Sequence, residues 1–183
     1  CNRNGIDEPV GINAVERFLG DYALEKGWQL PVPAADTGKR ILIVGAGPAG
    51  LSAAYQLRRL GHAVHVVESA EAAGGMMRYG IPKYRLPREV LDQEIARITA
   101  LGVEFEFGRE VKDLNAEMKS AGYDAAFLGA GASLAHRAYI PAGDAAHILD
   151  AVSVLRSMEA PDQGEDAPML GRRVVVYGGG NTA

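Results

Sequence analysis

Short apolar runs alternate with amphipathic stretches along most of this chain. The run 41–44 is wholly apolar, as in a strand buried on both faces of a parallel sheet. Residues 49–60 have apolar positions at helical spacing, and 63–67 form a second apolar run. Because strand and helix alternate from residue 40 onward, the sequence predicts an α/β fold with a largely parallel sheet.

The same pattern predicts elements before and after this region. In chain order, we expect a helix over 13–26, a loop over 69–88, a helix over 89–101, a strand over 103–107, a helix over 114–121, a strand over 125–128, a helix over 145–158 and a strand over 173–177. The first helix has a possible capping box in Asn13 and Glu16, and Gly27 is suited to its end. Its predicted apolar face consists of Val15, Phe18, Leu19, Tyr22 and Ala23.

Composition narrows the classes of function. The 183 residues carry a net charge of −4 and no basic stripe, so we expect no nucleic-acid partner. One cysteine cannot form an internal disulfide or a self-contained metal site. The charge-free stretch 41–57 is interrupted by glycine and proline and is too short for a membrane span. Residues 1–10 contain no signal-peptide core, which says little about targeting if the true N-terminus is missing, and we expect a cytoplasmic protein.

A glycine motif carries the candidate chemistry. Residues 45–50 fit G-x-G-x-x-G between a predicted strand and a predicted helix; they are Gly45, Ala46, Gly47, Pro48, Ala49 and Gly50. Such a loop lets a dinucleotide pyrophosphate approach the backbone at the start of a helix. Glu68 follows about 20 residues later, where the motif requires an acid for the ribose. The alternatives are a glycine turn that binds nothing and a solvated carboxylate at a strand end.

A second glycine-rich run closes the chain. It fits G-x-G-x-x-A and contains Gly178, Gly179, Gly180, Asn181 and Thr182. Two such units indicate a protein with two dinucleotide sites, one for a flavin and one for a nicotinamide; the alternative is a stray glycine turn. Because the next strand is absent, NADH and NADPH cannot be distinguished. The chain begins with Cys1 and ends inside this run, so we interpret it as an internal piece of a longer polypeptide.

Longer motifs join these units into one series. Gly-Gly-Met-Met-Arg-Tyr-Gly-Ile-Pro covers 74–82, Tyr-Arg-Leu-Pro covers 84–87, and Asp-Ala-Ala-Phe-Leu-Gly-Ala-Gly covers 124–131. Together with both glycine runs, this series resembles the glutamate synthase small subunit family over essentially the whole chain. That group includes the flavin and NADPH domains of dihydropyrimidine dehydrogenase and the large subunit of NADH-dependent ferredoxin:NADP oxidoreductase. The motifs do not choose among these members.

The resemblance implies an FAD site and an NADP (or NAD) site. Residues 45–50 and Glu68 would hold the FAD pyrophosphate and ribose, and 178–182 would meet the nicotinamide dinucleotide. Further cofactor-binding residues implied by the matched motifs are Gly75, Met76, Arg85, Val111 and Gly131. The alternative for Arg85 is an exposed arginine in a proline-bounded loop. No catalytic side chain is implied, because the cofactor performs flavin chemistry.

The resemblance also implies an iron–sulfur domain before the flavin domain. Cys1 would be a ligand of a [4Fe–4S] cluster in the full-length protein; the alternative is a plain small residue. Glu16 lies near a position where relatives use a non-cysteine side chain on a second cluster; the alternative is a helix cap. We therefore expect 1–38 to end an iron–sulfur domain with its linker, 39–170 to form a Rossmann-like FAD domain, and 171–183 to start a truncated NAD(P) domain.

The function implied is an oxidoreductase in which NAD(P)H reduces FAD and the electrons leave through iron–sulfur clusters to a partner subunit or domain. An alternative of another class is an FAD-binding or interaction module without turnover. A flavin monooxygenase or amine oxidase is a weaker alternative, since the second glycine run and the 74–82 motif argue against it. A disulfide reductase is not expected, because no C-x-x-C follows the first glycine unit.

Overall fold

The computed structural model describes residues 1–132, 147–159 and 172–179. The chain divides into two compact units, Cys1–Pro31 and Val32–Ala183, which are described separately. Among the described helices, none is long and apolar enough to cross a membrane.

The first unit contains a short 3-10 helix, η1 (Asn2–Gly5), and the α-helix α1 (Ile12–Glu25). The helix predicted over 13–26 is thus confirmed to within one residue at each end. The predicted capping box is wrong: Gly11 occupies the N-cap position and no side chain caps the helix. The predicted end is confirmed, because Gly27 has a φ of +63°, a conformation that suits glycine.

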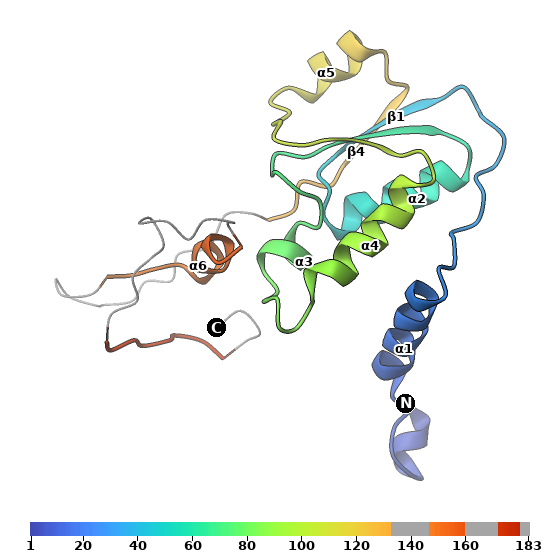
Figure 1. Ribbon diagram of the computed structural model, residues 1–183. Helices are drawn as coiled ribbons and strands as arrows, with labels where there is room; N and C mark the ends of the chain where they lie inside the picture. Colours follow the sequence, from blue (N-terminus) through green and yellow to red (C-terminus); the bar gives the residue numbers. More distant parts are fainter. Residues whose placement is uncertain (133–146, 160–171, 180–183) are drawn as a thin grey trace. The chain divides into compact units, whose positions relative to one another are not determined.

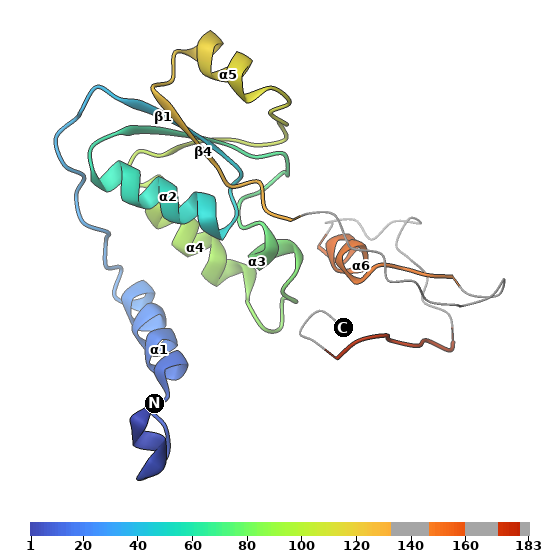
Figure 2. The same cartoon turned by 180° about the vertical axis from the view of Figure 1, so that it is seen from behind.

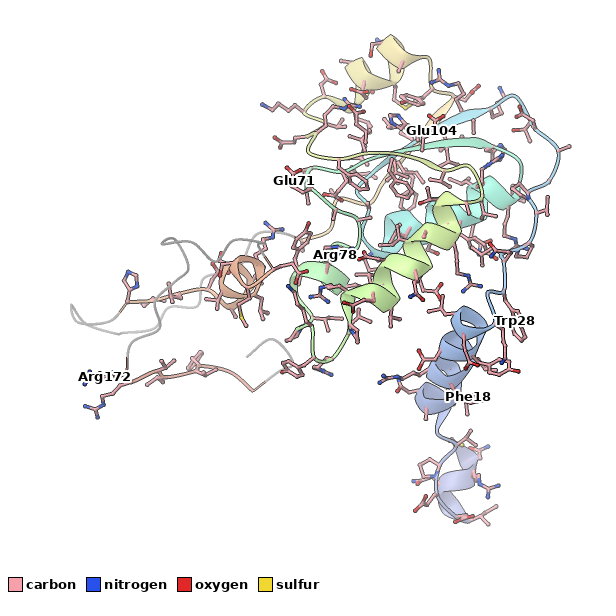
Figure 3. The ribbon with its side chains drawn as sticks, in the orientation of Figure 1. Phe18, Trp28, Glu71, Arg78, Glu104 and Arg172 are labelled. Carbon is pink, nitrogen blue, oxygen red and sulfur yellow. The ribbon has the colours of Figure 1, made fainter. Side chains whose placement is uncertain are left out.

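The predicted apolar face of α1 remains largely exposed. Ala23 is buried, but Phe18 is 64% exposed. The aromatic residues of this unit contact one another: the ring centroids of Phe18 and Tyr22 lie 5.9 Å apart, and those of Tyr22 and Trp28 lie 5.6 Å apart. Figure 3 shows Phe18 and Trp28 on this helix and the turn after it.

The second unit is built on a four-stranded parallel sheet. Its strands are β1 (Arg40–Val44), β2 (Ala63–Val67), β3 (Glu104–Glu106) and β4 (Ala125–Leu128), in the order β3-β2-β1-β4. All neighbouring strands pair in parallel. The predicted α/β fold with a parallel, Rossmann-like sheet is therefore confirmed.

Helices lie on both sides of the sheet (Figures 1 and 2). On one face lie α2 (Pro48–Arg59) and α4 (Arg88–Thr99), and on the other side lies α5 (Leu114–Ala121). The remaining helices are α3 (Met76–Tyr79) and α6 (Ala151–Ser157), which contact each other. The central strands are buried on both faces, since the adjacent residues Leu42 and Ile43, and Val66 and Val67, are all inaccessible to solvent or nearly so.

Three predicted elements differ from the structure. The segment expected to be a loop over 69–88 contains α3, a single turn too short to leave a periodic pattern. The helix expected from residue 145 begins at Ala151, because the Asp150 side chain accepts a hydrogen bond from the Ser153 amide and so starts the helix there. Residues 174–177 form no strand, since none of the described residues pairs with them.

Candidate functional site

The candidate site lies at the carboxyl ends of three strands. The glycine loop follows β1, Glu68 follows β2, and Gly129 follows β4. From β1 the chain adds β2 and β3 on one side and β4 on the other. In open α/β sheets, ligands bind beside the carboxyl ends of the strands at such a reversal of strand order. The topology thus creates a crevice at the glycine loop.

Two glycines hold this loop by close backbone contacts. Gly45 has a φ of +101°, and a Cβ atom there would lie 2.4 Å from the carbonyl oxygen of Gly129. A Cβ atom on Gly50 would lie 1.8 Å from the carbonyl oxygen of Gly45. Neither position can accept a side chain without moving backbone. The loop is therefore clamped between the first turn of α2 and the end of β4.

The glycine between them is different. Gly47 has an ordinary φ of −75°, and a Cβ atom on it would approach no atom more closely than the Cα of Gly75, at 3.8 Å. The fold itself therefore does not require glycine at this position. Gly47 is also the N-cap of α2 and offers no side chain to cap the helix. The result is a helix N-terminus that no side chain caps, an arrangement that favours an anion such as a pyrophosphate.

Glu68 is tied to the same loop. Its Oε2 accepts a hydrogen bond from the Ala46 amide at 2.6 Å, and its Oε1 accepts from the Ala70 amide at 2.9 Å and the Ser69 hydroxyl at 3.1 Å. The half-buried carboxylate is thus held by fixed donors instead of being solvated at a strand end. Its remaining lone pairs can accept hydrogen bonds from ligand hydroxyls.

The segment after β2 packs onto the glycine loop. The Gly74 amide donates to the carbonyl oxygen of Ala46 at 2.8 Å. Gly75 has a φ of +51°, and a Cβ atom there would lie 2.7 Å from the Cα of Gly47. Two backbones therefore meet at these glycines, and Gly75 lies beside Gly47.

A cavity of about 370 Å³ lies next to this contact. Its lining residues are Pro48, Met76, Met77, Gly80, Ile81, Pro82 and Arg85. The structure thus brings Met76 and Arg85 together with the start of α2. Most of the lining is apolar, which suits a flat aromatic group, and Arg85 adds a cation.

Val111 lies in the segment between β3 and α5. That segment is bound to the Glu68 strand end: the Gly108 amide donates to the carbonyl oxygen of Ala70, and the Arg109 amide donates to that of Glu68, both at 3.0 Å. Val111 is half-buried there. Val111 thus follows closely on residues that are bound to the Glu68 segment, and it does not line the cavity.

Ion pairs reinforce the Glu68 side. The Arg109 guanidinium donates to both carboxylate oxygens of Glu117, at 2.9 and 3.0 Å, and also pairs with Glu106 at 2.9 Å. Hydrogen bonding from Arg109 holds the pKa of the Glu117 carboxyl below its ordinary value. The same bonds raise the pKa of Arg109. This end of the site is thus firmly held at neutral pH.

The remaining expected residues follow β4 or lie in the last described segment and beyond it. Gly131 is exposed, with a φ of +69°. Gly178 and Gly179 are exposed in the segment 172–179, while Gly180, Asn181 and Thr182 lie outside the described residues.

No metal site forms among the residues that the structure describes. Cys1 is exposed, and within those ranges no three His, Cys, Asp or Glu side chains lie together to hold an ion. Glu16 is also exposed. The part of the chain described here thus does not by itself fit an iron–sulfur cluster, and the assignment of Cys1 as a ligand stays a prediction.

Two contact residues lie within the quoted motifs but were not singled out as site residues. Gly129 packs on Gly45, and Gly74 donates to the loop, although neither was predicted to belong to the site. A signal for Gly129 was present, because a Gly-x-Gly pattern at a strand end often marks close backbone approach. Gly74 is distinguished only by its tertiary contact.

Comparison with known proteins decides the family. The family model described as "Pyridine nucleotide-disulphide oxidoreductase" matches residues 39–183. The chain belongs to this family. The match begins at β1 and includes the whole crevice. The chain has a single cysteine, Cys1, which precedes the matched region, so this family member carries no redox dithiol within residues 39–183.

Curated relatives match along the full length of the chain. The chain is 37% identical over 185 residues to the NAD-dependent dihydropyrimidine dehydrogenase subunit PreT of Salmonella typhimurium, covering all of this chain and 44% of that protein. It is 35% identical over 192 residues to the glutamate synthase [NADPH] small chain of Escherichia coli, covering all of this chain and 41% of that protein. The chain thus spans less than half the length of these relatives.

A solved structure agrees at the level of the fold. The 6-hydroxypseudooxynicotine amine oxidase of Pseudomonas geniculata N1 superposes on 76% of this chain and 22% of its own, with a TM-score of 0.51 and 23% sequence identity. This likeness concerns the fold alone.

Proposed function

We propose that the second unit binds FAD at the carboxyl ends of β1 and β2, as part of an oxidoreductase in which NAD(P)H reduces the flavin. The observation that carries this proposal is the contrast within the glycine loop. Gly45 and Gly50 are required by the fold, whereas a Cβ atom on Gly47, at a helix N-terminus, would make only an ordinary van der Waals contact with the Gly75 Cα at 3.8 Å. A glycine that the fold does not require is accounted for by a ligand that approaches the backbone there.

In this proposal, different residues bind different parts of FAD. The amides at the start of α2 receive the pyrophosphate, and Glu68 accepts hydrogen bonds from the ribose hydroxyls. Met76 and Arg85 line the cavity that receives the ring end, together with Gly75 at its edge. Val111 contacts the adenine through its backbone, and Gly131 passes over the cofactor. When bound, FAD supplies two-electron and one-electron redox chemistry that the side chains lack.

The electrons leave through iron–sulfur clusters to a partner subunit or domain. The partner subunit is supported by the names of two relatives, a glutamate synthase small chain and a dihydropyrimidine dehydrogenase subunit. In the full-length protein, Cys1 ligates one [4Fe–4S] cluster. The run from Gly178 to Thr182 meets the NADP (or NAD) pyrophosphate. An acceptor other than a dithiol is also in keeping with the single cysteine of the chain.

The substitution Gly47→Ala tests the FAD site. A methyl group fits the fold here, so we expect the free energy of unfolding to change by less than about 1 kcal/mol. The same methyl group blocks the pyrophosphate, so the Kd for FAD, measured by flavin fluorescence, is expected to rise by roughly tenfold or more. The control is Gly20→Ala in α1, where a Cβ atom meets nothing within 4 Å. Equal FAD affinity in wild type and Gly47→Ala would place the pyrophosphate elsewhere.

The full-length protein distinguishes a reductase from a binding module. FAD-loaded full-length protein is mixed anaerobically with NADPH or NADH, and the flavin absorbance is followed. Bleaching without any organic substrate supports the reductase. FAD binding without bleaching by either nucleotide favours a binding module without turnover, and bleaching that requires an amine favours an amine oxidase.

A further inference from the structure

Arg88, the first residue of α4, is a cation at an unfavourable end of a helix. Helix N-termini carry a partial positive charge, so acidic residues are favoured in the first turn. The Arg88 side chain is nevertheless only 12% exposed. When a guanidinium is withdrawn from water, the protein must supply a counter-charge and acceptors for its N–H groups. The groups that accept hydrogen bonds from Arg88 therefore indicate its structural role.

Four backbone carbonyls accept hydrogen bonds from Arg88. Its Nη1 donates to the carbonyl oxygen of Leu86 at 2.8 Å and, at the longer distance of 3.4 Å, to that of Met77. Its Nη2 donates to the carbonyl oxygen of Arg78 at 2.5 Å and to that of Ile81 at 2.7 Å. Two of these residues are in α3, whose last carbonyls have no partner within the helix. One side chain thus joins α3 to both sides of the following turn.

Glu159, just after α6, holds the guanidinium from the other side. The Arg88 Nε donates to one carboxylate oxygen at 2.9 Å and Nη2 donates to the other at 3.0 Å. Such two-point pairing fixes the plane of the guanidinium as well as its position. The Glu159 side chain is also 12% exposed, and Lys83 lies 3.7 Å from its carboxylate.

The segment that Arg88 gathers is the one that lines the cavity. Met76, Ile81, Pro82 and Arg85 contribute to the lining. Their neighbour Arg78 adds a separate attachment, because its Nε donates to the carbonyl oxygen of Ala73 at 2.6 Å and its Nη2 pairs with the Asp92 carboxylate on α4. Figure 3 shows Arg78 where α3 meets α4. The cavity wall is thus held in shape by arginine side chains that lie behind it.

We propose that Arg88 is a positioning residue for the cavity segment 76–86, and that Glu159 keeps Arg88 in the orientation that performs this role. The inference deepens the proposed function and rests on it, because Met76 and Arg85 belong to the proposed FAD site. Arg88 itself does not line the cavity. Because Glu159 holds Arg88, a displacement of the end of α6 would also shift the cavity segment.

The substitution Arg88→Lys tests this directly. Lysine keeps the charge but presents a point charge instead of a planar fork, so it cannot serve four carbonyls and both carboxylate oxygens. We expect amide hydrogen exchange in 76–86 to speed up by roughly tenfold without FAD, while exchange in β2 is unchanged. We also expect the Kd for FAD to rise by about tenfold and the visible circular dichroism of the bound flavin to change at saturation.

Matched controls separate positioning from general stability. Arg97→Lys alters an arginine of the same helix, 18% exposed, which forms an ion pair with Glu94 on α4 itself. It is expected to leave exchange in 76–86 and the flavin signal unchanged. Glu159→Gln removes the ionic hold on Arg88 while keeping the carbonyl contacts, so an intermediate effect is expected; Glu94→Gln is its control. If Arg88→Lys does not fold, the comparison of Glu159→Gln with Glu94→Gln still tests the positioning role.

The outcomes separate the two proposals. If wild type fails to bind FAD, the proposed function is wrong, and the exchange of 76–86 still decides the role of Arg88. If Arg88→Lys and Glu159→Gln match their controls in both exchange and flavin dichroism, the positioning role is refuted. Faster exchange in 76–86 with an altered flavin signal in these two variants alone supports it.

Discussion

The atoms nearest to an added Cβ show which glycines of the nucleotide loop are required by the fold and which are not. At Gly45 and Gly50, a Cβ atom would overlap backbone carbonyl oxygens, at 2.4 and 1.8 Å. At Gly47, the nearest atom would be 3.8 Å away. The motif in the sequence treats these three positions alike. Their surroundings give them different physical reasons for being glycine.

Gly50→Ala is therefore expected to harm the fold before it harms binding. The methyl group would have to displace the Gly45 carbonyl, and backbone on both sides of the contact is fixed by β1 and α2. We expect a loss of about 2–4 kcal/mol in the free energy of unfolding, measured by urea denaturation. Gly47→Ala is the control from the same loop. A Gly50→Ala protein as stable as Gly47→Ala would contradict the close contact.

At the scale of the element, the local sequence predicted most of what formed. The apolar runs became β1, β2 and β4, and the helix expected over 114–121 is α5 with the same bounds. Failures occurred where tertiary structure decides: the single turn of α3 and the run 173–177, which lacks a pairing strand among the described residues. The site followed the same rule. Its motif was readable, but the contact of Gly129 and the hydrogen bonds of Arg88 join residues that no local pattern relates.

The end signals of α5 show why its bounds were predictable. Asp113 accepts a hydrogen bond from the Ala116 amide at 3.0 Å, and Gly122 ends the helix with a φ of +65°. Asp113→Ala should cost about 1 kcal/mol of unfolding free energy, measured by urea denaturation with far-UV circular dichroism. Asn115→Ala, inside the same helix and exposed, is the control and should be close to neutral. An equal loss in both variants would show that the cap is not the cause.

At the scale of the second unit, one ion pair joins the start of β1 to the start of β4. Asp124 accepts hydrogen bonds from the Lys39 ammonium and the Arg40 amide, both at 2.8 Å. The hydrogen bond from Lys39 lowers the pKa of Asp124 below its ordinary 3.8 and raises that of Lys39 above 10.5. The contribution of the pair to stability is therefore complete between these ordinary values. It is lost as pH falls through the lowered pKa of Asp124 or rises through the raised pKa of Lys39.

Asp124→Asn should make this contribution visible as a pH dependence. At neutral pH the variant should be less stable than wild type, and the difference should shrink as the pH falls below the ordinary 3.8 of Asp124, where the wild-type carboxylate becomes protonated. Urea denaturation of both proteins from about pH 7 to pH 2 measures it. The exposed Glu110→Gln serves as control. A difference that stays constant over this range would show that the pair is not electrostatic in origin.

The pairing of β1 with β4 also governs the order in which the sheet can be assembled. Arg40 and Asp124, which join the starts of these strands, are 84 positions apart in the chain. During synthesis, β1 gains β2 early but keeps one open edge until 125–128 have left the ribosome. An apolar strand with an unpaired edge is a template for pairing with other chains. The nascent protein is thus most vulnerable to aggregation in the interval before β4 emerges, and the glycine crevice, which needs the end of β4, is the last part of the sheet to become complete.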